Sequence, residues 1–149
     1  LTAAETGHLV MATLHANDVA QTVTRIVDTF PSHQQEQIRA QLASALLGVV
    51  SQRLLPSKNG GRTAVFEVML ANPAVRTLVR EDKLHQIPNI LETSRREGMI
   101  TMDNAVKEAY ESGKITYEEG MRYVLNPKIL TPPVEPKVEP RPAPVRPLR

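Results

Sequence analysis

The chain has 149 residues, no cysteine and a formal net charge of +2, so it is one ordinary domain or part of a larger one. The lack of cysteine excludes disulfides and cysteine-based metal sites, and no apolar run approaches the ~20 residues of a membrane span. We therefore expect a soluble, cytosolic chain without direct membrane insertion. Residues 131–149 account for the whole net charge, and aromatic residues are scarce, so nucleic acid is not an expected partner.

A short buried strand is the first predicted element, over residues 9–14. This largely apolar run is too short for a helix of its own and is bounded by Gly7 and by a polar turn over 16–18. Such a run is typical of a strand buried on both faces, as in a parallel sheet. Ligands of open α/β sheets bind beyond the carboxyl ends of the strands, so we expect Thr13 and His15 at a ligand crevice.

Two helices and a β-hairpin are predicted between this run and residue 70. Asp18 can cap a helix that extends to Phe30 with apolar side chains at helical spacing, and a second helix follows it. The pattern then changes to β-rich runs over 49–55 and 62–70, with turn residues over 56–61 between them. We therefore expect a hairpin at a sheet edge.

The segment after residue 70 is predicted to be helical. Asn72 is a good N-cap, and Pro73 suits the first turn because its missing N–H costs nothing there. Three further helices are expected, each with its own start or stop signal: 83–96 before Gly98, a helix from Thr101 or Asp103 to Gly113, and 116–125 with a capping box of Thr116 and Glu119. These helices predict a compact helical subdomain.

The end of the chain is predicted to be an extended, mobile tail. Residues 131–149 contain seven of the twelve prolines and no apolar periodicity, which is typical of polyproline II structure. Two PxxP spacings, at 133–136 and 144–147, leave a docking peptide as the alternative to the solvated tail that we favour. The sequence does not indicate a partner for this tail.

Two stretches carry a resemblance to a known family. Residues 7–18 read GHLVMATLHAND, which closely resembles the His box of the type IV pilus retraction motors (PilT-like), members of the secretion ATPase superfamily. Residues 74–81 read AVRTLVRE, which resembles the AIRNLIRE motif of the same motors, with valine for isoleucine twice and Thr77 for asparagine. The runs at 51–55 and 60–69 also fit the family core. The resemblance spans about residues 1–126.

This resemblance implies an α/β fold with three parts. Residues 1–70 would be the C-terminal portion of a RecA-like P-loop ATPase core, 71–126 a helical C-terminal subdomain and 127–149 a disordered Pro-rich tail. The implied protein is a hexameric motor that couples ATP hydrolysis to type IV pilus retraction and twitching motility. Its implied cofactors are ATP and Mg²⁺, and its partner is an inner-membrane pilus platform protein. It would work in the cytoplasm, peripherally at the inner membrane.

The resemblance also implies roles for the two histidines. By its position alone, His15 is better interpreted as a structural histidine whose ring nitrogens are hydrogen-bonded within the fold. The resemblance implies the opposite, because in the family this histidine approaches the γ-phosphate as a sensor. His8 lies seven residues earlier, about 23 Å away along an extended strand and on its opposite face. We therefore expect no metal site between them, and we assign His8 to support of the His box.

Further candidate residues lie in the second motif and on the hairpin. On a helix, Arg76 and Arg80 share a face, with Glu81 to one side, which is the pattern of an ordinary amphipathic helix. The resemblance makes all three candidates for salt bridges that transmit the nucleotide state. Thr13, Arg53 and Arg62 are candidates for a nucleotide or subunit border, with ordinary sheet structure as the slightly favoured alternative for the hairpin residues.

The sequence lacks the phosphate-binding part of such a motor. It contains no G-x-x-x-x-G-K-[ST] loop. It also has no acidic residue at the end of a strand before residues 9–14, where such a motor would bind Mg²⁺, because the sequence starts too late to include one. Since the chain starts at Leu1 within a helix-like stretch, we expect a C-terminal fragment that cannot hydrolyse ATP by itself. The alternatives are a pilus-extension or type II secretion ATPase, against which residues 74–81 argue, and a non-catalytic interaction module.

Overall fold

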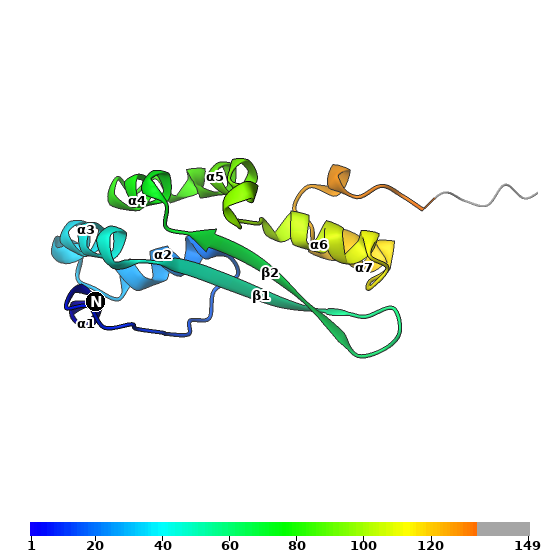
Figure 1. Ribbon diagram of the computed structural model, residues 1–149, viewed down its shortest axis with the longest axis horizontal. Coiled ribbons are helices and arrows are strands. Elements are labelled where there is room, and N and C mark those ends of the chain that lie inside the picture. Colours follow the sequence, from blue (N-terminus) through cyan, green and yellow to red (C-terminus); the bar gives the residue numbers. More distant parts are fainter. Residues whose placement is uncertain (134–149) are drawn as a thin grey trace, which may run out of the picture.

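The computed structural model of the chain describes residues 1–133, and the other residues of the predicted tail, with its PxxP spacings, lie outside this range. Figure 1 shows a long twisted hairpin that runs through the molecule, with helices along one side and the extended N-terminal segment along the other. The elements in chain order are α1 (Thr2–Glu5), α2 (Val19–Asp28), α3 (Gln35–Ala45), β1 (Gly48–Pro56), β2 (Arg62–Leu70), α4 (Pro73–Arg80), α5 (Ile87–Thr93), α6 (Met102–Glu111) and α7 (Tyr117–Tyr123). Short 3-10 turns precede or follow several of these helices, at Ser32–Gln34, Leu84–Gln86, Arg95–Glu97 and Pro127–Ile129.

The hairpin predicted from the sequence is confirmed. Strands β1 and β2 pair antiparallel from Gly48↔Leu70 to Pro56↔Arg62, and Val68 makes one further antiparallel bridge to Ile100. Side chains alternate between two faces, as the pleat requires. One face is buried beneath helices, and the other leaves Val50, Leu54 and Phe66 exposed.

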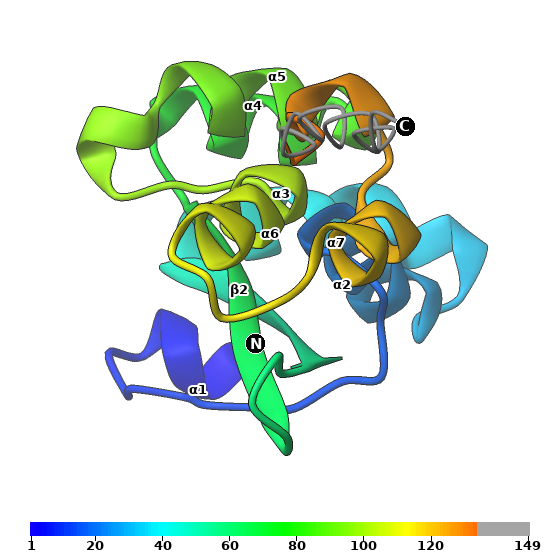
Figure 2. The same ribbon diagram turned by 90° about the vertical axis from the view of Figure 1, so that its right-hand side faces the viewer.

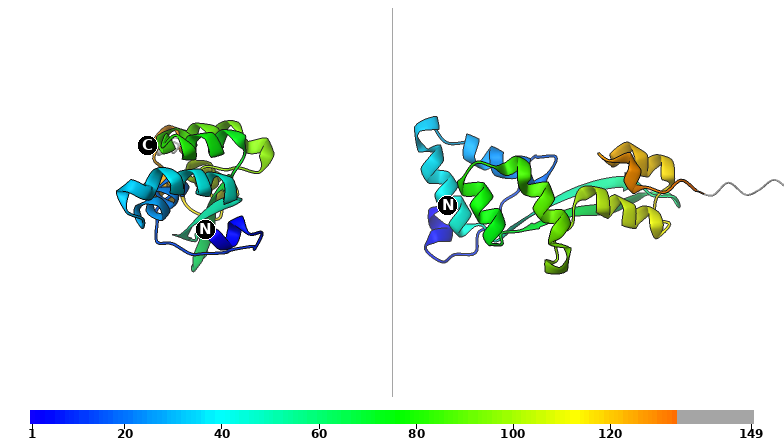
Figure 3. Two further views of the ribbon diagram at one scale, coloured as in Figure 1. Left: turned by 90° about the vertical axis from the view of Figure 1, so that its left-hand side faces the viewer. Right: turned by 90° about the horizontal axis from the view of Figure 1, so that it is seen from above.

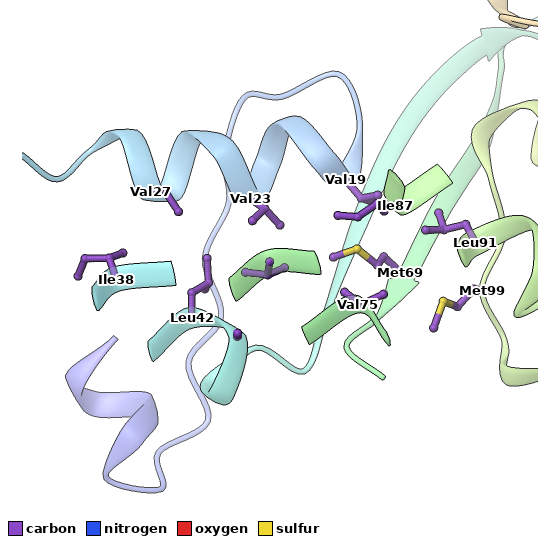
Figure 4. Packing of buried hydrophobic residues seen from close by; sticks show 12 residues of the cluster. Val19, Val23, Val27, Ile38, Leu42, Met69, Val75, Ile87, Leu91 and Met99 are labelled. Carbon is purple, nitrogen blue, oxygen red and sulfur yellow. The ribbon is translucent and has the colours of Figure 1, made fainter. Parts of the chain in front are cut away.

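One buried cluster joins the first helices to those that follow the hairpin. Its apolar side chains come from α2, α3, β2, α4, α5 and the segment before α6 (Figure 4). Its members are Val19, Val23, Val27, Ile38, Leu42, Ala43, Met69, Val75, Val79, Ile87, Leu91 and Met99. The helical stripe predicted after Asp18 is thereby confirmed, and the Asp18 carboxylate accepts the Gln21 N–H at 2.7 Å as an N-cap. Because this cluster draws on both sides of residue 70, the division into two parts there stays a prediction.

A second buried cluster lies along the far half of the hairpin. Leu55 and Val65 of the strands pack in this cluster against side chains of α6 and of the segment that follows it. These are Met102, Ala105, Val106 and Ala109 of α6, and Ile115. Figures 2 and 3 show α6 and α7 lying over the hairpin, beside the group formed by α2 to α5. Leu130 is buried against Gly120 of α7, where a Cβ atom would come within 2.9 Å of the leucine side chain. Packed structure therefore continues to residue 130, past the predicted start of the tail at 127.

The strand predicted over residues 9–14 is absent from the described structure. The segment is irregular, and Leu9 and Met11 are 77% and 89% exposed. A strand buried on both faces is typical of a parallel sheet covered by helices, whereas the sheet within the described residues is a two-stranded antiparallel hairpin. Residues 9–14 pair with neither strand of this hairpin, so the prediction of a buried strand is wrong for this structure.

The helix predicted over 83–96 is shorter than expected. A 3-10 turn at Leu84–Gln86 precedes α5, and another at Arg95–Glu97 follows it. Pro88 lies in the first turn of α5, where it is tolerated, rather than inside a longer helix. Gly98 closes the segment with a left-handed backbone at φ 94°, as its position predicted.

Candidate functional site

The turn over residues 15–18 carries the first predicted site residue, His15. This side chain is exposed, and together with Leu14 it faces an open depression beside α2, which is also lined by Arg25, Asp28 and Thr29. The polar turn then leads directly into the N-terminus of α2. The described structure therefore presents the His15 imidazole at an accessible surface rather than in a buried crevice.

Side chains of the hairpin hold this turn in place. The Arg53 guanidinium donates to the Asn17 carbonyl over 3.2 Å, and the Ser51 hydroxyl donates to the same oxygen over 3.4 Å. The backbone N–H of Val19 donates to Oε2 of Glu67 over 2.9 Å. Arg53, a candidate for a nucleotide or subunit border, thus lies against the backbone of the His15 turn.

Glu67 was not among the predicted site residues, although it is a buried acid on the inner face of β2. Burial raises the pKa of its carboxyl above the ordinary value, while hydrogen bonds from the backbone of Val19 and Met102 partly oppose this effect. Asp18 nearby raises the pKa further, and Arg53 lowers it. The signal in the sequence was a glutamate at an inward position between the apolar Val65 and Met69.

The other residues of the first motif lie apart from these contacts. His8 is exposed at the end of α1, with Nδ1 3.1 Å from the Thr6 hydroxyl and 3.2 Å from the Ala3 carbonyl oxygen. Thr13 is exposed in the irregular segment before His15. Arg62 is exposed opposite Pro56 at the hairpin turn. The described structure does not bring Arg62 or His8 to the contacts that hold the His15 turn.

The three charged residues of the second motif have separate surroundings. Arg76 is half-buried, and its Nη1 donates to the carbonyls of Ala43 and Ser44 over 2.5 and 2.6 Å. These carbonyls belong to the C-terminal turn of α3, which has no helical N–H to satisfy them and which a positive charge stabilises. Arg80 is exposed at the end of α4. The Glu81 carboxylate pairs with Lys83 over 2.7 Å, and this hydrogen bond lowers the pKa of Glu81.

Replacing Arg76 with alanine is expected to lower the free energy of unfolding by about 1–3 kcal/mol. The substitution removes two hydrogen bonds and leaves the part-buried carbonyl of Ala43 and the exposed carbonyl of Ser44 without the Arg76 donor. Urea denaturation of the 149-residue chain, followed by circular dichroism, measures the change. Arg80→Ala on the same helix is the matched control and should stay within about 0.5 kcal/mol of the parent. Equal losses in the two variants would contradict this role of Arg76.

A comparison with protein-family models matches residues 1–122 to the family described as type II/IV secretion system protein. The chain belongs to this family. The resemblance to pilus retraction motors inferred from residues 7–18 and 74–81 is also confirmed, because relatives from that group are similar over most of the chain.

Two relatives of this secretion-system chain illustrate the match. It is 47% identical to a "Twitching motility protein" of Neisseria gonorrhoeae over 127 residues, covering 85% of this chain and 34% of that protein. It is 43% identical to the type IV pilus retraction ATPase PilT of Pseudomonas aeruginosa, covering 79% of this chain and 34% of the relative. A crystal structure of the pilus retraction motor PilT with bound ADP superposes with a TM-score of 0.75 at 44% identity, covering 87% of this chain and 36% of that one.

This member of the family therefore spans about one third of the length of these relatives. Its mixed α/β fold matches part of the PilT structure, as the sequence predicted in outline. Within residues 1–133, no helix combines the length and the hydrophobicity that crossing a bilayer requires. The same residues bring together no group of three or more histidine and acidic side chains that could hold a metal ion.

Proposed function

We propose that this chain is the C-terminal part of a hexameric motor ATPase that couples ATP hydrolysis to type IV pilus retraction. The observation that carries the proposal is the similarity over residues 1–122, together with the identity of 43–47% to a retraction ATPase and a twitching motility protein. The motif at 74–81 favours retraction over pilus extension or type II secretion. By this proposal the ring acts at the cytoplasmic side of the inner membrane, on a pilus platform protein.

In this proposal the chain supplies a phosphate sensor rather than a complete nucleotide site. The exposed His15 imidazole can donate a ring N–H to a terminal phosphate oxygen, and the contacts to Asn17 and Val19 hold its turn in position. The sequence has no phosphate-binding loop, and the described residues have no acidic cluster for Mg²⁺. The groups that hold ATP and Mg²⁺ would therefore come from other parts of the motor.

The remaining residues have supporting roles in the proposal. Residues 1–70 complete a RecA-like core, 71–126 form the helical part, and 127–149 include the Pro-rich tail. His8 supports the His box. Arg76, with Arg80 and Glu81 on the same segment, transmits the nucleotide state, and the contact of Arg76 with the end of α3 is the physical link that supports this role.

A chimeric motor tests the proposed function. Residues 1–126 of this chain would replace the matching third of the gonococcal twitching motility protein in a strain that lacks the native protein. We expect the chimera to hydrolyse ATP and to restore twitching, because the two proteins are 47% identical there. The 149-residue chain alone is expected to release no phosphate above background. Phosphate release by the isolated chain, or a chimera that hydrolyses ATP without retracting pili, would overturn the proposal.

A further inference from the structure

The carbonyl of Asn17, two residues after His15, receives two donors from one strand. Nη2 of Arg53 donates to it over 3.2 Å, and the hydroxyl of Ser51 donates to the same oxygen over 3.4 Å. Ser51 and Arg53 are two positions apart on β1, so the pleat points both side chains to the inner face of the hairpin. A carbonyl oxygen has two lone pairs and can accept both hydrogen bonds. The two side chains therefore hold the same backbone atom of the turn.

These contacts matter because little else in the described structure restrains the turn on its N-terminal side. Residues 9–14 are irregular and exposed. On the other side α2 begins at Val19, whose N–H donates to Glu67 over 2.9 Å. Between the exposed segment and the helix, the Asn17 carbonyl is the point at which β1 fixes the turn that bears His15.

The polar pair interrupts the strand between the two buried clusters. The inner face of β1 consists of Val49, Ser51, Arg53 and Leu55 in order. Val49 packs against the first buried cluster, and Leu55 belongs to the second. Ser51 is only 7% exposed, although burial of a hydroxyl is costly unless it is hydrogen-bonded. Apolar side chains at positions 51 and 53 would extend either cluster but would not donate to Asn17, so these two positions support the turn rather than the core.

We propose that Arg53 is a positioning residue, which holds the His15 turn through the Asn17 carbonyl instead of binding the nucleotide itself. This inference rests on the proposed function, because it assigns the phosphate contact to His15. A ring N–H stabilises a phosphate oxygen only within hydrogen-bond distance, and a displacement of about 1 Å can lower a rate about 10²-fold. Ser51 is the second donor to the same oxygen, so either side chain keeps part of the restraint when the other is lost.

Nuclear magnetic resonance relaxation of the 149-residue chain tests the restraint without requiring motor activity. We expect the backbone amides of residues 16–18 to have order parameters of about 0.8 in the parent and below about 0.6 in the double variant Ser51→Ala/Arg53→Ala, while α6 keeps its values. Gln52→Ala, on the exposed face of the same strand, is the matched control and should change neither. A turn that is already flexible in the parent, that keeps its order in the double variant, or that loosens together with α6 would overturn the restraint.

Steady-state kinetics of the chimeric motor distinguish positioning from nucleotide binding. We expect Arg53→Ala to lower kcat for ATP about fivefold with KM unchanged, and Ser51→Ala to lower kcat about twofold. The double variant should lose about 30-fold or more, which exceeds the product of the single effects because the two donors share one acceptor. Arg53→Lys, which keeps a donor, should recover part of kcat, and Gln52→Ala should match the parent.

The same kinetics show how the inference would fail. A loss of stability alone would lower the folded fraction and leave the kcat and KM of the folded motor unaltered. A higher KM for Arg53→Ala with unchanged kcat would mean that Arg53 binds the nucleotide directly. Either result, or single effects that simply multiply in the double variant, overturns the positioning role while the proposed function stands. If the parent chimera itself fails to retract pili, the proposed function is wrong, and so is the inference that rests on it.

Discussion

Replacing Ile87 with alanine is expected to lower the free energy of unfolding of the chain by about 2–5 kcal/mol. Ile87 is fully buried at the start of α5, in the cluster that contains Val19 and Met69 (Figure 4). The substitution removes three carbon atoms from a site enclosed by α2, β2 and α4, where the cavity cannot collapse without moving several elements. Urea denaturation of the 149-residue chain measures the loss.

The matched control for Ile87 is Leu125→Ala. Leu125 is 90% exposed, so its truncation removes little buried area and should change the free energy of unfolding by less than about 0.5 kcal/mol. The comparison separates loss of packing from the general effect of shortening an aliphatic side chain. A loss at Ile87 no larger than that at Leu125 would mean that the described cluster does not hold the chain together.

Replacing His15 with alanine in the chimeric motor is expected to lower kcat for ATP by about 10²–10³-fold and to abolish twitching. The reason is the loss of a positioned N–H donor to the terminal phosphate. ADP has no such phosphate, so its affinity, measured with a fluorescent ADP analogue, should be unchanged. This combination distinguishes a phosphate sensor from a residue that merely supports the fold.

His85→Ala is the control for His15. His85 is also exposed, in the 3-10 turn before α5, and it lies outside both motifs. We expect this variant to retain the kcat and the twitching of the parent chimera. A decrease of less than about threefold in kcat for His15→Ala, or an equal loss of ATP and ADP binding, would contradict the proposed role of His15.

Much of the local structure could be predicted because its causes are local. The caps at Asp18 and Asn72 follow from side chains that reach an N–H three residues later, and both are present. The hairpin follows from two β-rich runs around a turn in which Gly60 and Gly61 adopt positive φ angles. These features depend on only a few neighbouring residues, so periodicity and turn chemistry were sufficient.

The site was less predictable, because its contacts join distant segments. Arg76 was expected on a charged helix face, but the end of α3 lies against it and takes its hydrogen bonds. Residues 9–14 were expected to be buried, yet they join neither strand of the hairpin, and Leu9 and Met11 are exposed. The family resemblance identified His15 as a candidate, and its role as a phosphate sensor stays a prediction.

The amino-acid sequence by itself determined most of the helices, the caps at Asp18 and Asn72, the hairpin and the resemblance to the retraction motors. These features are encoded in short stretches, where side chains act on their own backbone. Only the tertiary structure decided that Glu67 accepts the N–H of Val19 at the start of α2, and that Arg53 holds the turn of His15. Contacts of this kind arise when residues 34 to 48 positions apart are packed together, and no local pattern specifies them.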